Sequence, residues 1–323
     1  MRALITGITG FVGPHLAEYL LTAHPECEVW GLAWGEAGRQ QLEPLKPRLE
    51  LVEADLTKPR SILPAVRAAR PDLVFHLAAA SSVASSWTSP ALFVEVNVIG
   101  QINLFEALRA EALDPVVVVS SSGDVYGQVG AELLPAREDL PLQPVSPYGL
   151  SKAGQDLCAY QYFAAHSLRT VRLRLFNHTG PRRPSGFVLS SFARQLAEIE
   201  AGRSAATVRV GNLDAVRDFL DVRDVARAYG LAATRGRAGE AYNVCSGVGL
   251  TIREVLHRLL ALSQTRVEVT VDPERLRPAD VPVLYGDHGR FTAATGWRPE
   301  IALEQTLADM LAWWRQEVGR SGV

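Results

Sequence analysis

The sequence predicts an α/β protein with a doubly wound parallel sheet and a smaller, partly interleaved C-terminal domain. Three observations support this fold class. Short apolar runs alternate with helical patterns through the first half, a glycine-rich turn directly follows the first of these runs, and the second half is less regular, with loops rich in Pro, Gly and Arg. Continuous apolar strands separated by helices are typical of a parallel sheet that is covered by helices on both faces.

The elements of the first half follow from local patterns. Strands are expected where short apolar runs are bounded by turn residues, at residues 2–6, 28–32, 49–53, 73–77, 116–120 and 170–176. Helices are expected where apolar residues recur at helical spacing, at residues 14–21, 94–110 and 147–165. The β-branched run at 116–120 is unbroken, which suits a strand that is buried on both faces.

The second half is expected to complete a binding cleft. Its predicted helices are residues 191–201 and 252–262, and its predicted strands are residues 208–210 and 267–271. We expect a dinucleotide-binding domain at residues 1–175, to which roughly residues 215–245 return. The remaining segments, 176–214 and 246–323, would form a sugar-nucleotide-binding domain.

Composition excludes several classes of protein. The 33 basic and 35 acidic residues leave a net charge of −2, which provides no broad attraction to nucleic acid or anionic lipid. No apolar run approaches the roughly 20 residues of a membrane-spanning helix, and Gly7 and Gly10 interrupt the first apolar stretch, which argues against a signal peptide. The three cysteines lack the spacing of a metal site. We therefore expect a cytoplasmic protein with no nucleic-acid partner, no membrane partner and no metal.

The glycine-rich turn predicts a dinucleotide site. It lies directly after the first strand and opens the first helix, where glycines allow a tight turn and bring the backbone close to a pyrophosphate. This context indicates a Rossmann-like fold. The cofactor-binding residues expected in this turn are Gly7, Thr9, Gly10, Phe11, Val12 and Gly13.

The end of the second strand does not settle which nicotinamide cofactor is bound. An acidic residue there holds the ribose of NAD, whereas an arginine accommodates the 2′-phosphate of NADP. The segment from Leu32 to Glu36, followed by Arg39, meets neither rule cleanly. We assign Trp34 and Arg39 to this position and leave the choice between NADP and NAD open.

A tyrosine and a lysine form the candidate catalytic pair. Tyr148 and Lys152 are four residues apart and so share one face of a helix. The lysine is expected to favour the phenolate and lower the tyrosine pKa, so that Tyr148 can donate a proton to a carbonyl as hydride arrives. Ser122 ends the fifth strand and can donate a hydrogen bond to the same oxygen. Lys152 is one of only three lysines among the 33 basic residues, and arginine cannot titrate in this role.

Further motifs run over nearly the whole chain. They are the glycine-rich turn, Asp55-Leu56, His76-Leu77-Ala78-Ala79, Asn97-Val98-x-Gly100, Ser120-Ser121-Ser122, Tyr148-x-x-x-Lys152, Arg217-Asp218-Phe219-x-x-Val222-x-Asp224-Val225 and Tyr242-Asn243-Val244. In this combination the chain resembles the extended short-chain dehydrogenase/reductase superfamily. The resemblance places Asp55 near the adenine and Asn97 in the active-site hydrogen-bond relay. It adds Leu56, Leu77, Ala78 and Ala79, with Tyr148 and Lys152, to the cofactor-binding residues, and Ser81 to the substrate-binding ones.

The second half is similar to the GDP-mannose branch of that superfamily. The similarity lies in residues 176–181, 186–188, 210–218 and 276–282. The branch contains GDP-mannose 4,6-dehydratase and GDP-4-keto-6-deoxy-D-mannose reductase. By this resemblance Asn177, Val188, Asn212, Arg217, Arg277 and Asp280 line the GDP-sugar site. The two arginines suit a diphosphate, and Asp280 suits ribose hydroxyls.

Asp124 bears on the reaction. Dehydration needs a base and an acid, and dehydratases of the superfamily resemble one another in placing Glu where this chain has Asp124. Asp is one methylene shorter, and proton transfer tolerates little misplacement. We interpret Asp124 as a turn residue that caps local backbone, while keeping it as a candidate catalytic residue. The expected reaction is therefore reduction of GDP-4-keto-6-deoxy-D-mannose at C4 to GDP-D-rhamnose.

Three alternatives to this reductase are left open. The first is GDP-mannose 4,6-dehydratase, and a less favoured one is an epimerase of another sugar nucleotide. A third is a non-catalytic dinucleotide-binding protein, although such proteins typically lose the tyrosine or lysine that this chain has. By analogy with the superfamily, the helices at 94–110 and 147–165 are expected to pair across a homodimer.

Overall fold

A seven-stranded parallel sheet is the main element of the protein. The computed structural model describes residues 1–263, 265–275 and 281–320. Its sheet has the order β10-β6-β5-β4-β1-β2-β3, and every neighbouring pair is parallel. The strands are β1 (Arg2–Thr6), β2 (Glu28–Ala33), β3 (Leu49–Glu53), β4 (Leu73–His76), β5 (Val116–Ser122), β6 (Arg169–Leu175) and β10 (Ala241–Val244). The predicted fold class is confirmed.

The strand order reverses between β1 and β4. Strands β2 and β3 lie on one side of β1, whereas β4, β5 and β6 lie on the other. At such a reversal the connections after the two strands turn to opposite faces of the sheet and leave a crevice at the carboxyl ends. The glycine-rich turn follows β1 and residues 77–80 follow β4, so both segments border this crevice.

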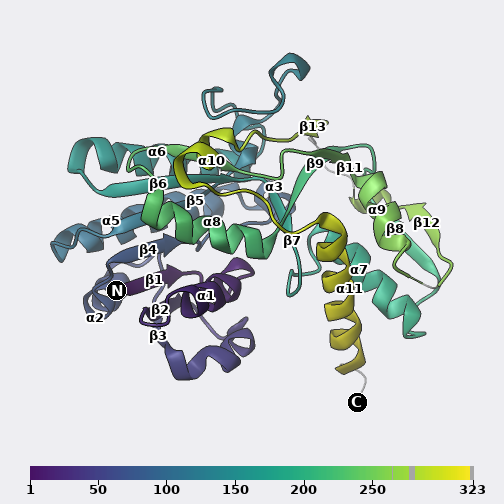
Figure 1. The fold of residues 1–323 in the computed structure, drawn as a ribbon, viewed down its shortest axis with the longest axis horizontal. Coiled ribbons are helices and arrows are strands. Elements are labelled where there is room, and N and C mark those ends of the chain that lie inside the picture. The colour runs from purple at the N-terminus through teal and green to yellow at the C-terminus, as the bar shows by residue number, and fades with distance from the viewer. Residues whose placement is uncertain (264, 276–280, 321–323) are drawn as a thin grey trace.

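Helices cover both faces of the sheet (Figure 1). One face carries α1 (Val12–Ala23), α8 (Val222–Arg235) and α10 (Gly289–Thr295), and the other carries α2 (Pro59–Ala69), α5 (Gly100–Ala110) and α6 (Pro147–His166). Leu4 packs in the core on one face and Ile5 in the core on the other. Successive side chains of a strand point to opposite faces, so a sheet covered on both sides requires the unbroken apolar runs seen in the sequence.

One helix is longer than the sequence predicts. The helix expected at residues 94–110 begins at Pro90 and continues as α4 (Pro90–Val94), a π-helical segment η2 (Glu95–Ile99) and α5. The helix has 21 residues, and an 18-residue window within it has a mean hydropathy of 1.4. It is therefore long and apolar enough to cross a membrane by length and composition, which corrects the expectation that no run approaches that length. It packs against α2 and α6 in the helical layer of the sheet, and core helices of soluble proteins pass the same test.

The smaller domain forms the lobe beside the sheet in Figure 1. Its strands are β7 (Asn177–Thr179), β9 (Val216–Asp221), β11 (Gly249–Thr251) and β13 (Val283–Leu284) in one sheet, and β8 (Thr207–Val210) and β12 (Glu268–Val271) in another. Its helices are α7 (Val188–Glu200), α9 (Ile252–Leu260) and α11 (Leu303–Arg320). Phe192, Leu256 and Met310, one from each helix, are fully or almost fully buried in a shared core.

Short helical segments fill the connections. They are η1 (Arg39–Arg48), α3 (Val83–Thr88), η3 (Gly123–Tyr126), η4 (Ala131–Leu133) and η5 (Pro273–Arg275).

The chain returns to the main sheet later than predicted. The return was expected at about residue 215, but β9 pairs with β7, β11 and β13 in the smaller domain. The return begins with α8 and ends with β10 beside β6. Phe291 of α10 and Trp297, both expected in the smaller domain, lie in the core of the main sheet. The sequence analysis predicts no strand at β9, and only its pairing partners decide which sheet it joins.

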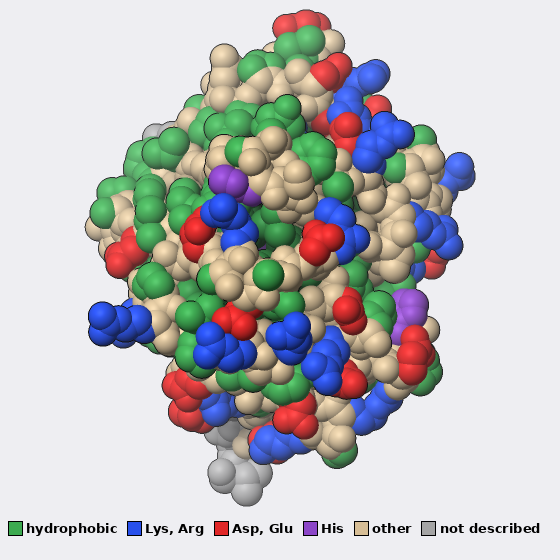
Figure 2. Space-filling model, turned by 90° about the vertical axis from the view of Figure 1, so that its left-hand side faces the viewer, with side chains coloured by type: hydrophobic (Ala, Val, Ile, Leu, Met, Phe, Trp, Pro, Cys, Tyr) green, Lys and Arg blue, Asp and Glu red, His purple; other side chains and the backbone are tan. Residues whose placement is uncertain are grey.

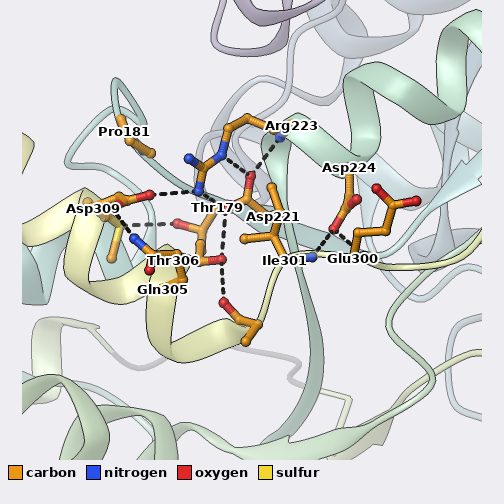
Figure 3. Close-up of polar contacts among 12 residues, drawn as sticks. Thr179, Pro181, Asp221, Arg223, Asp224, Glu300, Ile301, Gln305, Thr306 and Asp309 are labelled. Carbon is orange, nitrogen blue, oxygen red and sulfur yellow. Dashed lines mark hydrogen bonds and ion pairs between the residues drawn. The ribbon is translucent and has the colours of Figure 1, made fainter.

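Two carboxylates at the start of α8 attach the C-terminal segment (Figure 3). Asp221 Oδ2 accepts a hydrogen bond of 2.8 Å from the Thr306 hydroxyl. Arg223 joins Asp221 to Asp309 of α11 through two contacts of 2.8 Å. One turn on, Asp224 Oδ2 accepts hydrogen bonds from the backbone of residues 300 and 301. These contacts connect α11 to the point where the chain passes from one domain to the other.

Charges of both signs mix on the surface. Figure 2 shows a face on which basic and acidic side chains are interspersed, while hydrophobic side chains gather toward its upper part. On this face, therefore, neither sign of charge forms a continuous patch.

A buried carboxylate links α6 to the sheet. Asp156 is fully buried and binds Arg172 Nη1 at 2.8 Å and Arg174 Nε at 2.9 Å. Burial by itself raises the pKa of Asp156, but the hydrogen bonds and charge of Arg174, with the charge of Arg172, lower it below its usual value. Both guanidinium groups belong to β6, so this one carboxylate is shared by two cations that are nearly removed from water.

We expect Asp156→Ala to lower the free energy of unfolding by about 3–5 kcal/mol, because it leaves two buried guanidinium groups without their anion. Urea unfolding at neutral pH measures this loss. Asp139→Ala, at an exposed carboxylate, is the control and should change stability by less than about 0.5 kcal/mol. Since the folded pKa of Asp156 is depressed, its contribution is full above about pH 4 and is lost as the pH falls below it.

Candidate functional site

The glycine-rich turn lies against the end of β4. Gly7 has a φ of +69°, and a Cβ atom there would lie 2.7 Å from Ala78 Cα. A Cβ atom on Gly13 would lie 2.3 Å from the Ile8 carbonyl oxygen. Larger residues would therefore collide with backbone at both positions. The turn exposes the start of α1, whose first N–H groups receive no side-chain cap from Phe11, as a site for pyrophosphate requires.

The segment after β2 sits against the same turn. Gly38 has a φ of +78°, and a Cβ atom there would lie 2.1 Å from the Thr9 carbonyl oxygen. Trp34 is 72% exposed at the edge of this segment. The Arg39 guanidinium is held by the Gly35 carbonyl at 2.9 Å and by two carboxylates, Glu53 at 3.2 Å and Glu36 at 3.5 Å. The local charge is thus mixed, and the choice between NADP and NAD stays open.

Asp55 and Leu56 follow β3 beside the crevice. Asp55 Oδ1 accepts hydrogen bonds from the backbone and the hydroxyl of Thr57. Lys58 Nζ lies 3.1 Å from the second carboxylate oxygen. Leu56 is buried against Gly100 at the start of α5. The acidic side chain is therefore held in one orientation near the switch point.

Asn97 connects three segments of the crevice. It lies in the π-helical segment η2 and is fully buried. Its Oδ1 accepts from the Ala80 backbone at 2.7 Å, and its Nδ2 donates to the Ala80 carbonyl and to Ser151 Oγ. The Ser151 hydroxyl in turn donates to the Tyr148 carbonyl at 2.7 Å. Asn97 thus joins the loop after β4 to the first turn of α6.

The start of α6 brings Tyr148 to the end of β5. Ser146 caps the helix by accepting from the Gly149 backbone at 3.0 Å, with Pro147 at the first helical position. A Cβ atom on Gly149 would lie 2.9 Å from the Asp124 carbonyl oxygen. This close packing places the tyrosine beside η3, which follows β5.

Ser122 and Asp124 bind one another. Ser122 Oγ donates to Asp124 Oδ2 at 2.9 Å and accepts from the Asp124 backbone at 3.2 Å. The cap of this turn is therefore Ser122, and the expectation that Asp124 caps local backbone is corrected. The Asp124 carboxylate instead accepts a hydrogen bond from the Ser122 hydroxyl, and this bond orients the hydroxyl.

The electrostatics of Tyr148 differ from the prediction. Burial raises the pKa of Tyr148, the Asp124 carboxylate raises it further, and the Ser122 hydroxyl and Arg183 lower it. The expected lowering by Lys152 is not what governs the phenol, because burial dominates in a cleft of low polarity. A phenol with a raised pKa keeps its proton at neutral pH, which suits a proton donor.

Lys152 is buried beneath the crevice. Its side chain is only 2% exposed, and Nζ donates to the Ser120 carbonyl at 2.9 Å and to Gln155 Oε1 at 2.8 Å. Burial lowers the pKa of Lys152 to about 7. An ammonium group has three donors, so the two protein acceptors leave one N–H for a further ligand.

Two residues at the crevice were missed by the sequence analysis. The His178 ring stacks on Phe11 at 5.9 Å between centroids and 10° between planes. The Arg183 guanidinium lies 4.5 Å from the centre of the Phe11 ring and 3.5 Å from that of Phe187. The histidine lies within a motif that drew attention only for Asn177, and among so many arginines the local pattern singled out none in residues 181–184.

Among residues 1–263, 265–275 and 281–320, no carboxylate forms an ion pair with Arg183, whose charge lies against aromatic rings. Its Nε is buried and makes no hydrogen bond among the described residues. Burial lowers the pKa of Arg183 to about 9, while Tyr148 raises it. Burial, with the charges of Arg183 and Lys152, also lowers the pKa of His178 to about 3. A guanidinium held by two aromatic rings beside the glycine-rich turn suits an anionic group of a dinucleotide.

The predicted substrate residues lie around the smaller domain. Asn177 begins β7 and is exposed, Val188 begins α7, Asn212 is exposed before β9, and Arg217 lies on β9. Strands β7 and β9 pair, so Asn177 and Arg217 belong to one small sheet. Ser81 is exposed in the loop between β4 and α3. Arg277 and Asp280 lie outside the described residues.

The donors present fit a dinucleotide rather than a metal. In residues 1–263, 265–275 and 281–320, no three His, Cys, Asp or Glu side chains gather in a group that could hold a metal ion. The glycine-rich turn and the uncapped start of α1 form a cradle of backbone groups. The Arg183 guanidinium adds a positive charge beside it. This arrangement fits the predicted nicotinamide dinucleotide.

Comparisons with known proteins agree with this site. A family model described as GDP-mannose 4,6 dehydratase matches residues 4–310. The chain is 38% identical over 317 residues to the GDP-6-deoxy-D-mannose reductase of Pseudomonas aeruginosa, with 98% of each chain covered.

Solved structures are similar over the same length. The structure of RMD from Pseudomonas aeruginosa complexed with NADPH has a TM-score of 0.86 at 36% identity and covers 98% of this chain and 100% of its own. The UDP-glucose 4-epimerase of Thermus thermophilus in complex with NAD has a TM-score of 0.86 at 32% identity and covers 98% of this chain and 99% of its own. The resemblance drawn from the motifs is confirmed, and the two cofactors left open by the sequence are the two that these relatives bind.

Because burial lowers the pKa of Lys152 to about 7 in the folded protein, the unfolded chain binds more protons there between about pH 7 and pH 10. The stability of the wild type relative to Lys152→Met should therefore rise as the pH increases from about 7 to 9, whereas below pH 7 the difference should be flat. Chemical unfolding at several pH values measures it. Lys46→Met, at an exposed lysine, is the control, and a pH-dependent difference of equal size there would contradict the prediction.

Proposed function

Since the chain belongs to the GDP-mannose 4,6-dehydratase family, we propose that it is an NAD(P)H-dependent reductase of GDP-4-keto-6-deoxy-D-mannose. The product would be GDP-D-rhamnose, formed by reduction of the C4 ketone. The observation that carries this proposal is the combination of a protonated Tyr148 with an Asp124 whose carboxylate is bound to Ser122. The extent of the likeness to a reductase, 98% of both chains, supports it.

The residues have separate roles in the proposed reaction. NAD(P)H, when bound, would supply the hydride that reduces C4 and would leave as NAD(P)⁺. Tyr148 donates its proton to the C4 oxygen, which becomes the hydroxyl of the product, and the resulting phenolate is reprotonated from solvent. Ser122 donates a hydrogen bond to the same oxygen when the bound substrate replaces Asp124 as the acceptor of the serine hydroxyl. Lys152 holds the nicotinamide ribose and stabilises the phenolate as it forms.

The geometry at Asp124 favours reduction over dehydration. A dehydratase needs a free base to remove the C5 proton and an acid to assist loss of the C6 hydroxyl. Asp124 accepts the Ser122 hydroxyl at 2.9 Å and raises the pKa of Tyr148. The first contact occupies the carboxylate, and the second keeps the resting phenol protonated, so the site holds a proton donor beside a carboxylate that is already engaged. Dehydration of GDP-mannose is the second candidate function because the family model carries that name.

The cofactor and substrate sites meet at Arg183. We infer that the pyrophosphate lies at the start of α1 and that Arg183 and His178 close over it from the smaller domain, since both stack on Phe11. The GDP-sugar would lie along β7, β9 and α7, near Asn177, Val188, Asn212 and Arg217. Arg277 and Asp280 remain proposals from the resemblance. We propose a cytoplasmic location, in keeping with reduced, unpaired cysteines.

An apolar surface supports the proposed homodimer. The helix from α4 to α5 packs beside α6, and both expose large apolar side chains, each at least 38% exposed: Leu92, Val94, Ile99, Leu150, Leu157 and Tyr160. A contiguous apolar surface on two neighbouring helices suits a four-helix contact between two copies.

The first experiment follows nicotinamide absorbance after mixing the purified protein with GDP-4-keto-6-deoxymannose and NADPH or NADH. We expect oxidation of the cofactor and formation of a GDP-rhamnose product. Tyr148→Phe should lower kcat by at least about a hundredfold, because the general acid is lost, while folding and cofactor binding persist. Conversion of GDP-mannose to a 4-keto product without added cofactor would instead establish a dehydratase and make Asp124 its base.

The homodimer is tested by light scattering after gel filtration. The wild type should have twice the chain mass of 35.1 kDa, and Leu157→Glu should be a monomer, because it places a charge in an apolar contact. Val271→Glu, which changes an apolar residue of β12 that is 62% exposed, is the matched control and should leave the mass unchanged. A monomeric wild type would overturn this part of the proposal.

A further inference from the structure

A row of buried polar side chains crosses the dinucleotide-binding domain. It begins at Lys152, passes through Gln155 on the same helix to His76 of β4, and ends at Thr6 of β1. Gln101 of α5 joins it from the side. The last four of these side chains are fully buried. Buried polar groups are normally hydrogen-bonded, and these side chains provide partners for one another.

The contacts form one continuous path. Gln155 Oε1 accepts from Lys152 Nζ at 2.8 Å. Gln155 Nε2 lies 3.2 Å from Gln101 Oε1 and 3.3 Å from His76 Nε2. His76 Nδ1 lies 2.8 Å from Thr6 Oγ1. Gln101 Nε2 donates to the backbone carbonyl of Gln155 at 2.9 Å, which fixes the orientation of the Gln101 amide.

The donor and acceptor properties of these side chains allow only one direction of hydrogen bonding along the path. The ammonium of Lys152 can only donate, so the amide atom that faces it must be the oxygen of Gln155. The amide nitrogen then points to Gln101 and His76, where it donates. His76 Nε2 is consequently an acceptor, and the ring carries its proton on Nδ1 and donates to Thr6. Burial and the charge of Lys152 lower the pKa of His76 to about 3, which is consistent with a neutral ring.

The far end of the path reaches the cofactor crevice. Thr6 Oγ1 also accepts from the Ala78 backbone at 3.2 Å. Ala78 is the residue against which Gly7 lies most closely. The same set of side chains therefore contacts the catalytic ammonium and the loop after β4 that borders the proposed cofactor site.

We propose that Gln155 is a positioning residue that holds the Lys152 ammonium under the nicotinamide ribose, with its amide oriented by Gln101 and His76. The inference rests on the proposed function. Of the three Nζ donors, one is taken by Ser120 and one by Gln155, so the direction of the third is set. With the Ser120 carbonyl alone, the four-carbon chain of lysine could rotate and the third donor would have no defined direction.

Hydrogen bonding, rather than the filling of space, calls for glutamine at this buried position on α6. An apolar side chain of similar length would leave Lys152 Nζ, Gln101 Oε1 and His76 Nε2 each without the partner that Gln155 provides. The glutamine instead supplies the one acceptor that the ammonium lacks. Other charged and titratable groups that bear on this end of the crevice are Tyr148, Asp124, His178, Arg183 and Tyr229.

The test compares Gln155→Met and Gln155→Glu with the wild-type holoenzyme across pH. Methionine preserves the length but removes the acceptor, so kcat for reduction should fall about a hundredfold through misplacement of the ammonium. The alkaline limb of the pH profile of kcat for Gln155→Met should move to lower pH, because the buried ammonium loses an acceptor. Glutamate restores an acceptor and adds a charge, so activity should partly return and the limb should move to higher pH.

Binding of NADPH, followed by fluorescence, is the readout that does not depend on the substrate. Gln155→Met should weaken it about tenfold relative to Gln305→Met, the matched control at a glutamine of α11 that lies on the surface. If the wild type binds NADPH but reduces no 4-keto sugar, the proposed function fails while this comparison still decides the role of Gln155. Equal NADPH affinity in Gln155→Met and the wild type would overturn the inference. The inference would also be overturned if both Gln155 variants had a lower kcat but the alkaline limb of the pH profile stayed at its wild-type position. Should Gln155→Met not fold, Gln155→Glu alone decides through the direction of its limb.

Discussion

The contact between the ends of β1 and β4 is the constraint on which the rest of the site depends. A Cβ atom on Gly7 would lie 2.7 Å from Ala78 Cα, so the two strand ends can approach only with glycine at this position. This approach brings the turn before α1 and the loop after β4 to the two sides of one crevice. The positions of Thr6, Asn97 and Lys152 follow from it, because each is tied by hydrogen bonds to one of these two segments or to the neighbouring strand.

Two cations illustrate how the fold prepares the crevice for charge. Lys152 is held by a carbonyl and an amide oxygen, and Arg183 by two aromatic rings. Because both groups are buried, neither is solvated as a surface cation would be, and the pKa of each is lowered as a result. Cations that are fixed in advance and poorly hydrated stabilise an anion more strongly than mobile surface groups, because little reorganisation is needed when the anion arrives.

The interleaving of the domains places these groups together. Strand β7 follows β6 after a single residue, and the loop after β7 carries Arg183 back over Phe11. His15 of α1 reaches the same loop, at 3.1 Å from the Pro181 carbonyl, and Arg182 binds Glu18. The chain then makes the smaller sheet and returns through α8. Cofactor and substrate elements are thus coupled along short stretches of chain rather than across a flexible linker.

Local patterns in the sequence were sufficient to predict six of the seven strands of the main sheet and the catalytic helix, whereas β10 was not predicted. The strands at residues 2–6 and 49–53 match their predicted limits, and Tyr148 and Lys152 share α6, because apolar runs and i, i+4 spacing are local properties. The folded chain was needed to show that β9 joins the smaller sheet, that Asp124 binds Ser122 and that burial dominates the pKa of Tyr148. The same holds for Arg183 and Gln155, whose partners come from other elements of the chain. Pairing partners and desolvation arise between segments far apart in sequence, so no local pattern encodes them.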